Sequence, residues 1–277
     1  MDLSCVRQVP IVGAMKSYGQ FCPVAKACEI VAERWTPLVL RELLCGSTRF
    51  SELQRGVPLM SRTLLTQRLR ELEEAGVVAS VPRARGRGRE YRLTPAGEEV
   101  RSLIMGLGEW GQRWARRQVA ADDLDAELLA WDMHRRLNVD RLPARRVVVR
   151  FDLRGVPRHQ PGRKTWWLVL TLPEVDLCLK DPGFEVDLTV DADLMALTRV
   201  WMGDMPLQDA LRGGLIRLDG PRALVLAFPT WFGLSLFAGV ERPAVVSPAR
   251  VPGRGSIGRA ARPRLRESPR LHPARQP

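Results

Sequence analysis

Apolar residues recur at helical spacing through the first 120 residues, and this pattern predicts a run of short helices. The clearest case is the stretch 61–74, in which Leu65, Leu69 and Leu72 fall on one face. Ser61 stands where its side-chain oxygen can cap the first turn. The opposite face is polar and carries Thr63, Thr66, Gln67 and Arg70. Such a helix can lie in the major groove of DNA, although an ordinary solvated helix shows the same pattern.

Three more helices are predicted upstream of this stretch. They begin near Pro23, Thr36 and Phe50, and the first has the apolar stripe Val24, Ala27, Cys28 and Val31. Residues 56–58, Gly-Val-Pro, form the turn that leads into the stretch 61–74. Two short helices joined by a tight turn predict a helix-turn-helix in which the second helix reads the DNA.

A β-hairpin is predicted directly after the reading helix. Two strand-like runs, 77–81 and 90–94, flank a turn that contains Arg83, Arg85, Arg87 and Arg89. Strand, basic turn and strand predict a wing whose arginines face solvent or phosphate. A flexible Arg-Gly loop is the alternative, and the helix-turn-helix upstream favours the wing.

A long helix is predicted over residues 95–119. Its apolar stripe consists of Val100, Leu103, Ile104, Leu107, Trp110, Gly111 and Trp114. A domain this small cannot cover such a stripe alone, so the pattern predicts dimerisation, which would place two reading helices about 34 Å apart. The G-x-G-x-x-G at 106–111 lacks the preceding strand of a nucleotide site, and its glycines are expected to permit close helix–helix approach.

The pattern changes after residue 121, and the overall fold class predicted is α+β. A helix over 124–137 is followed by four strands over 147–153, 166–172, 175–179 and 184–190. Asp191 or Asp193 then caps a helix, and another helix runs from Met205 to Gly213. A short strand at 215–220 and an apolar helical stretch interrupted at Pro229 complete the series.

Charge divides the chain in the same way. The 277 residues carry a net charge of +12, and their number suggests about two domains. Residues 15–121 and 247–277 are each +7, whereas 122–246 is −2 and 1–14 is neutral. This division favours a polyanion-binding N-terminal domain joined to a domain with another role, although a GC-rich genome also enriches arginine.

Four regions are therefore expected. They are a disordered leader (1–14), a winged-helix and dimerisation domain (15–121), a ligand-binding domain (122–246) and a disordered Pro/Arg-rich tail (247–277). No apolar run reaches the length of a membrane span and no signal-peptide core is present, so a cytoplasmic location is expected.

No catalytic or metal chemistry is expected of this chain. The five cysteines form no C-x-x-C pair, which argues against a disulfide framework and a zinc site. Ser235 lies outside a G-x-S-x-G motif, the three histidines are scattered, and the pair Asp191 and Asp193 has no third metal ligand nearby. The sequence therefore predicts neither an enzyme nor a cofactor.

Several motifs in the first half follow one another at a recognisable spacing. They are 22–24 (Cys-Pro-Val), 33–36 (Glu-Arg-Trp-Thr), 40–43 (Leu-Arg-Glu-Leu), 49–53, 61–72, 73–77 and 91–97. On these motifs, residues 19–117 resemble the HxlR-type winged-helix regulators of bacteria, which implies a homodimeric DNA-binding transcription factor. Some members of the family sense oxidants or electrophiles through a cysteine at the position of Cys22, where a helix dipole favours the thiolate. The alternative is that Cys22 only packs.

The second half carries a resemblance of its own over about residues 140–240. Its motifs are 185–191, the helix 195–203, the run 206–220 and 231–235. They resemble the sterol-carrier-protein-type lipid-binding fold, which implies an α+β module with an apolar cavity. Candidate lining residues are Trp166, Trp201, Met202, Met205, Phe228, Trp231 and Phe232, each of which could equally fill a core.

Together these patterns predict a bacterial transcriptional regulator whose partners are double-stranded DNA, a second copy of the chain and a hydrophobic small-molecule effector. Thr63, Thr66, Gln67 and Arg70 are expected to face base edges, and Ser61 and Arg62 to meet phosphate or the first base. Two alternatives stay open: a lipid-binding protein whose basic head binds DNA only non-specifically, and a regulator switched by Cys22.

Overall fold

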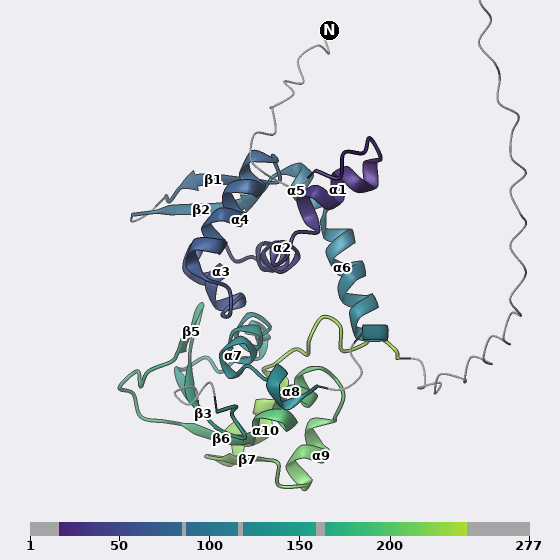
Figure 1. The fold of residues 1–277 in the computed structure, drawn as a ribbon. Coiled ribbons are helices and arrows are strands. Elements are labelled where there is room, and N and C mark those ends of the chain that lie inside the picture. Colours follow the sequence, from purple (N-terminus) through teal and green to yellow (C-terminus); the bar gives the residue numbers. More distant parts are fainter. Residues whose placement is uncertain (1–16, 85–86, 116–118, 159–163, 243–277) are drawn as a thin grey trace, which may run out of the picture. The chain divides into compact units, whose positions relative to one another are not determined.

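A computed structural model describes residues 17–84, 87–115, 119–158 and 164–242 of the chain (Figure 1). The expected leader 1–14 and tail 247–277, and Arg85 of the wing, lie outside the described residues. Two hydrophobic clusters organise the rest, one between Val39 and Ile104 and one between Leu124 and Trp231. Within the described ranges, no helix is long and apolar enough to cross a membrane.

The first cluster lies in a winged helix-turn-helix domain. Its elements are α1 (Pro23–Val31), α2 (Thr36–Leu44), α3 (Phe50–Gly56), α4 (Arg62–Glu74), β1 (Val78–Pro82) and β2 (Arg89–Leu93). The expected reading helix, α4, buries Leu65, Leu69 and Leu72, and Ser61 caps it by accepting a hydrogen bond from the Leu64 N–H at 3.2 Å. The strands pair antiparallel, with Ser80 opposite Tyr91. Periodicity and capping therefore predicted the reading helix and the hairpin correctly.

Helix α1 differs from its expected packing. None of its residues is buried, and Val24 of the predicted apolar stripe is 69% exposed. Only its last turn, with Ile30 and Val31, packs against the domain core. The stripe was predicted from periodicity, which shows that a face is apolar but not that a single chain covers it.

The single long helix predicted over 95–119 is interrupted. The structure has α5 (Pro95–Glu99), α6 (Arg101–Trp110) and a turn of π-helix, η1 (Gly111–Ala115), and residues 116–118 lie outside the described part. The break falls at Val100, whose N–H bonds to the carbonyl of Gly97 three residues earlier, which tightens the turn. Gly111 then begins the π-turn, in keeping with the weak helical preference of glycine.

The glycines of this segment were expected to permit close helix–helix approach, and the structure gives one of them another role. A Cβ on Gly108 would lie 2.1 Å from the ring of Phe237, so the missing side chain accommodates a phenylalanine from the end of the described chain. Around Gly106 and Gly111 no described atom lies within 4 Å of such a Cβ. The contact between Gly108 and Phe237 joins distant parts of the chain, so the local sequence around Gly108 does not predict it.

The second cluster lies in an α+β domain built on a mixed sheet. Its strands are β3 (Val147–Arg154), β4 (Thr165–Thr171), β5 (Glu174–Cys178), β6 (Leu188–Asp193) and β7 (Ile216–Asp219), in the order β5-β4-β3-β6-β7. Only β3 and β6 run parallel. Its helices are η2 (Ala121–Asp123), α7 (Ala126–Arg135), η3 (Val139–Arg141), α8 (Leu194–Trp201), α9 (Leu207–Arg212), α10 (Arg222–Ala227) and η4 (Phe228–Thr230).

Two boundaries in this domain were misplaced. Helix α7 starts later than the predicted 124, because Asp125 caps it by accepting from the N–H groups of Glu127 and Leu128, and it ends at Arg135 rather than 137. The strand expected over 184–190 begins only at Leu188 and continues to Asp193. Asp193 both ends that strand and caps α8, which settles the choice between the two aspartates.

Candidate DNA-binding and ligand sites

The outer face of α4 is the first candidate site. Thr63, Thr66, Gln67 and Arg70 are all exposed, as are Ser61 and Arg62 at its start. The buried leucines on the other face hold the helix against the domain core. The structure thus brings together on one exposed helix face the residues that the sequence selected.

A residue that sequence analysis missed holds α4 in place. Arg68, whose side chain is 13% exposed, pairs with Glu71 at 2.5 Å and with Glu33 at 3.2 Å, and donates to the backbone carbonyl of Arg34. These bonds tie the middle of α4 to the turn before α2. On the reading face, Gln67 donates to the Glu71 carboxylate at 2.9 Å and Thr66 to the carbonyl of Arg62. The Gln67 and Thr66 bonds both lie within α4, so neither of them ties its side chain to another element.

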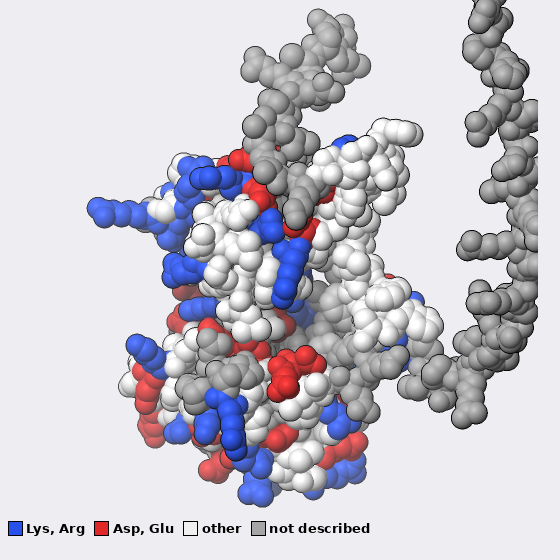
Figure 2. Space-filling model, in the orientation of Figure 1, with Lys and Arg blue, Asp and Glu red and all other residues white. Residues whose placement is uncertain are grey.

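The wing carries a concentration of positive charge (Figure 2, upper left). Two of the arginines that are expected to face solvent or phosphate also bond within the hairpin. The Arg89 guanidinium donates to the hydroxyl and carbonyl of Ser80, and Arg83 donates to the carbonyl of Arg87 and lies 4.0 Å from Glu90. Arg87 is exposed at the turn. Arginine on a hairpin can bond to the hairpin itself, which composition cannot reveal.

Cys22 lies at the start of α1, as its candidate role requires. The backbone N–H groups of Ala25 and Val24 lower the pKa of its thiol, although the sulfur does not meet the geometry of a full capping hydrogen bond. The side chain is partly exposed. This arrangement favours the thiolate, which is the nucleophilic and oxidisable form.

The α+β domain contains an apolar pocket of about 280 Å³ between its helices. Its walls come from α7 through Met133, from α8 through Leu197 and Trp201, and from Phe228 and Phe232 near the end of the described chain. Three of the seven predicted lining residues, Trp201, Phe228 and Phe232, therefore line it.

The other four predicted lining residues do not line this pocket. Trp166 and Trp231 are buried in the core, where the Trp166 ring stacks on Phe151 at 3.7 Å between centroids. Their indole N–H groups have no acceptor among the described residues. Met202 and Met205 pack against the core without reaching the pocket wall. Apolar character alone could not separate the wall from the core.

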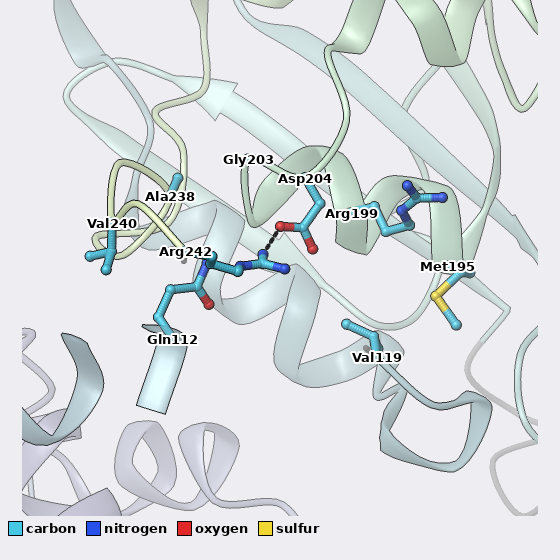
Figure 3. Close-up of a pocket in the computed structure, with 9 residues that line it drawn as sticks. All are labelled: Gln112, Val119, Met195, Arg199, Gly203, Asp204, Ala238, Val240 and Arg242. Carbon is cyan, nitrogen blue, oxygen red and sulfur yellow. Dashed lines mark hydrogen bonds and ion pairs between the residues drawn. The ribbon is translucent and has the colours of Figure 1, made fainter. Parts of the chain in front are cut away.

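A second, more polar pocket of about 660 Å³ lies between η1, α8 and the last described residues (Figure 3). Arg242 forms an ion pair with Asp204 across it, and Arg199, Gln112 and Met195 also line it. The sequence pattern does not predict this pocket, because its walls come from three separate segments of the chain, 112–119, 195–204 and 238–242.

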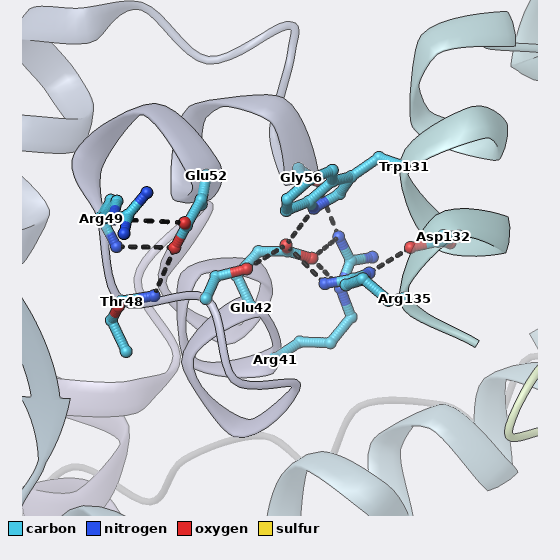
Figure 4. Close-up of polar contacts among 10 residues, drawn as sticks. Arg41, Glu42, Thr48, Arg49, Glu52, Gly56, Trp131, Asp132 and Arg135 are labelled. Carbon is cyan, nitrogen blue, oxygen red and sulfur yellow. Dashed lines mark hydrogen bonds and ion pairs between the residues drawn. The ribbon is translucent and has the colours of Figure 1, made fainter. Parts of the chain in front are cut away.

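A buried carboxylate joins the winged-helix domain to α7 (Figure 4). Glu42 of α2 is fully buried, and its two oxygens accept from Arg41 at 2.8 Å, from Arg135 at 2.7 Å and from the Trp131 indole at 3.1 Å. Ser47 adds a longer bond of 3.4 Å. We call these residues, with Gly56 and Asp132, the Glu42 cluster.

In the Glu42 cluster, neighbouring opposite charges shift the pKa values of Arg135 and Asp132 against the effect of burial. Burial alone would lower the pKa of Arg135, but Glu42 and Asp132 outweigh it and hold that pKa above its ordinary value. Burial raises the pKa of Asp132, and the nearby Arg135 and Arg41 offset only part of that effect. Gly56 is required for space, because a Cβ there would lie 1.8 Å from the Glu42 carboxyl carbon.

Known proteins resemble the first of these two domains. Residues 30–119 match the family model described as HxlR-like helix-turn-helix. The HTH-type transcriptional regulator Rv3095 of Mycobacterium tuberculosis is 43% identical over 97 residues, which are 34% of this chain and 60% of that protein. The chain therefore matches less than two thirds of that relative's length.

Two further proteins match over nearly their whole length. The HTH-type transcriptional regulator YvaP of Bacillus subtilis is 37% identical over 98 residues, or 34% of this chain and 90% of YvaP. The structure of the redox regulator HypR in its oxidized form shares 29% identity with a TM-score of 0.33, over 35% of this chain and 100% of HypR. On the match to YvaP and to the family model, the chain belongs to the HxlR-like helix-turn-helix family of transcriptional regulators.

Proposed function

We propose that this protein is a cytoplasmic transcriptional regulator that binds operator DNA as a homodimer and responds to an apolar small molecule. The exposed polar face of α4, opposite three buried leucines, carries this proposal. Thr63, Thr66, Gln67 and Arg70 face base edges, while Ser61 and Arg62 at the helix N-terminus meet phosphate or the first base. Arg83, Arg85, Arg87 and Arg89 of the wing hold the DNA backbone.

The dimer forms through α6 and the segment around it, within residues 95–119. Leu103, Leu107, Trp110 and Trp114 are between 53% and 59% exposed in the single chain. Phe21, just before α1, and Val24, within α1, are exposed as well, at 99% and 69%. Large apolar side chains gathered on one domain to this extent mark a protein–protein interface.

The effector site is the apolar pocket that Met133 of α7 and Trp201 of α8 help to line. The mixed sheet with helices around an apolar pocket is what a sterol-carrier-type domain would supply, and supports that assignment for residues 122–246. The pocket is small and lined by aromatic and aliphatic side chains, so a neutral apolar molecule suits it better than a charged one.

A DNA-binding titration tests the first half of the proposal. The probe is the protein's own upstream intergenic region, with random DNA as competitor, at two salt concentrations. A preference of about 10³-fold or more with a palindromic footprint is expected. Equal affinity for both DNAs that collapses with salt would leave the alternative, a lipid-binding protein whose basic head attracts any DNA.

Two variants separate base reading from backbone contact in the same assay. Gln67→Ala should relax preference at one base pair by about 1–3 kcal/mol, whereas Arg87→Ala should weaken binding to all sequences and lower the salt slope by about one. Identical effects of both variants on specific and random DNA would contradict the assignment of α4 as the reading helix.

The lowered pKa of Cys22 favours a second candidate, a redox switch in the same regulator. Oxidation of this thiol at the edge of the exposed apolar surface would alter dimer geometry. If so, operator affinity falls on treatment with hydrogen peroxide, and Cys22→Ser abolishes the response. A response that persists in Cys22→Ser excludes this role for the residue.

A further inference from the structure

Helix α7 contacts both candidate functional regions within a span of five residues. Trp131 and Arg135 bond to Glu42 of the winged-helix domain, at 3.1 Å and 2.7 Å. Met133, between them in sequence, lines the apolar pocket. The residues alternate because a helix turns by 100° per residue, so neighbours two apart point to different sides.

The contact on the winged-helix side is specific in geometry. The Arg55 guanidinium of α3 lies over the Trp131 ring, with its carbon 5.5 Å from the ring centroid. The Arg135 guanidinium carbon lies 5.7 Å from the same centroid. Arg41 donates at 2.8 Å both to Glu42 and to the carbonyl of Gly56, which ends α3. Helices α2 and α3 are therefore both bonded to the same point, where α7 meets the domain (Figure 4).

A displacement of α7 at its contact with Glu42 reaches α4 through packed side chains. Val39, Leu40 and Leu43 of α2 share one buried cluster with Leu65 and Leu69 of α4. Close-packed interiors shift as units rather than deform. Separating a buried carboxylate from its partners costs folding free energy, because the charge is left uncompensated. Glu42 and α2 therefore follow Trp131 and Arg135 when α7 moves.

We propose that α7 and the Glu42 cluster transmit occupancy of the apolar pocket to the DNA-binding helix. A neutral apolar molecule in the pocket displaces the Met133 wall of α7, and Trp131 and Arg135 carry that displacement through Glu42 to α2, α3 and α4. This inference rests on the proposed ligand site, but it concerns the route and not the ligand.

Hydrogen exchange of the full-length protein tests this route without DNA. The probe is N-phenyl-1-naphthylamine, a neutral apolar fluorophore whose binding is followed by its own emission. Exchange of the amides of α2 and α3 is measured with and without saturating probe in four proteins: the wild type, Trp131→Phe, Glu42→Gln and Trp167→Phe. Trp131→Phe removes the indole donor but keeps an aromatic ring and the pair between Glu42 and Arg135, so it tests the route even where Glu42→Gln fails to fold.

Trp167→Phe is the matched control. Trp167 lies on β4 with Arg150 over its ring at 6.0 Å, and among the described residues it makes no hydrogen bond to the winged-helix domain. The change removes the same group from the same domain. Probe binding should change exchange in α2 about fivefold or more in the wild type and in this control. In Trp131→Phe the change should fall below about twofold, with probe affinity unaltered within about threefold.

The outcomes separate this inference from the proposed function. Bound probe with an unchanged α2 in the wild type, or an undiminished response in Trp131→Phe, overturns the route and leaves the ligand site standing. A probe that does not bind overturns the apolar ligand site and this route together. Operator binding is measured separately and is decided by neither result.

Discussion

The two sides of the winged-helix domain invert the usual relation between polarity and exposure. On the side that meets α7, which we call the docked face, a carboxylate and two arginines are largely buried in the Glu42 cluster. On the side of α1 and α6, the open face, Phe21, Leu107 and Trp110 are more than half exposed. Figure 2 shows few charged side chains over the part of α1 in view.

The difference indicates what kind of partner each face can accept. Buried charges persist only where their counter-charges are supplied in fixed geometry, and on the docked face the same chain supplies Trp131 and Arg135. An apolar face needs no such precision, and on the open face a second copy of the chain would suffice. The proposed dimer and the internal contact thus use different physical chemistry.

The largest effect is expected from breaking the docked face with Glu42→Ala. The change leaves Arg41 without its Glu42 partner and Arg135 with Asp132 alone, and should cost about 3–5 kcal/mol of unfolding free energy, measured in urea. The control is Glu98→Ala, whose pair with Arg101 is about half exposed and should contribute less than about 1 kcal/mol. Equal losses for the two variants would show that the cluster is no more than a surface ion pair.

The open face is broken most directly by Leu107→Asp. A charge at the centre of the exposed stripe should cost about 2 kcal/mol or more of dimer stability, roughly a 30-fold rise in the dimer dissociation constant. Sedimentation equilibrium measures it. Leu226→Asp, at a leucine of α10 that is 67% exposed, should leave the dissociation constant unchanged. A wild-type chain that is monomeric at all concentrations contradicts the dimer itself.

A pair of glycine substitutions sharpens the comparison with opposite signs. Gly56→Ala places a Cβ 1.9 Å from a Glu42 oxygen, so the carboxylate must move and the unfolding free energy should fall by about 1–3 kcal/mol. Gly106→Ala on α6 meets no described atom within 4 Å and should raise helix stability by about 0.5–1 kcal/mol. Thermal unfolding compares the two, and destabilisation by both would mean that the open face is packed as tightly as the docked face.

The smallest effect concerns pH and Asp132. Burial raises the pKa of this carboxyl in the folded protein, so the folded state binds the proton more tightly than the unfolded state. Stability is therefore lost as pH rises from the ordinary aspartate value through the raised pKa. Asp132→Asn cannot titrate, and its melting temperature should exceed that of the wild type by a margin that grows as pH rises above the ordinary aspartate value. A margin independent of pH would contradict the raised pKa.

The local sequence pattern predicted many of the helices and strands, but it did not predict contacts between distant residues. Leu65, Leu69 and Leu72 revealed α4 because their spacing reflects the backbone, and Ser61 revealed its start. Glu42 could not be identified, because a glutamate within an amphipathic helix usually faces solvent and its partners lie 89 and 93 residues away.

The candidate sites were predictable to different degrees. The exposed face of α4 follows from the periodicity of one helix, so all its residues were selected correctly as a surface. The pocket depends on how helices pack, so large apolar residues such as Trp166 and Trp201 could not be sorted into core and wall. Arg89 shows the same limit in the wing, where a side chain bonds back to Ser80.

The separation of Glu42 from its partners also sets an order of events during synthesis. Arg135 follows Glu42 by 93 residues, so at about 5–20 residues per second the ribosome adds it roughly 5–20 seconds later. The helices of the N-terminal domain leave the ribosome first, with Glu42 still hydrated and Gly56 beside it. The full set of bonds that encloses the Glu42 carboxylate can form only after Trp131 and Arg135 have been added.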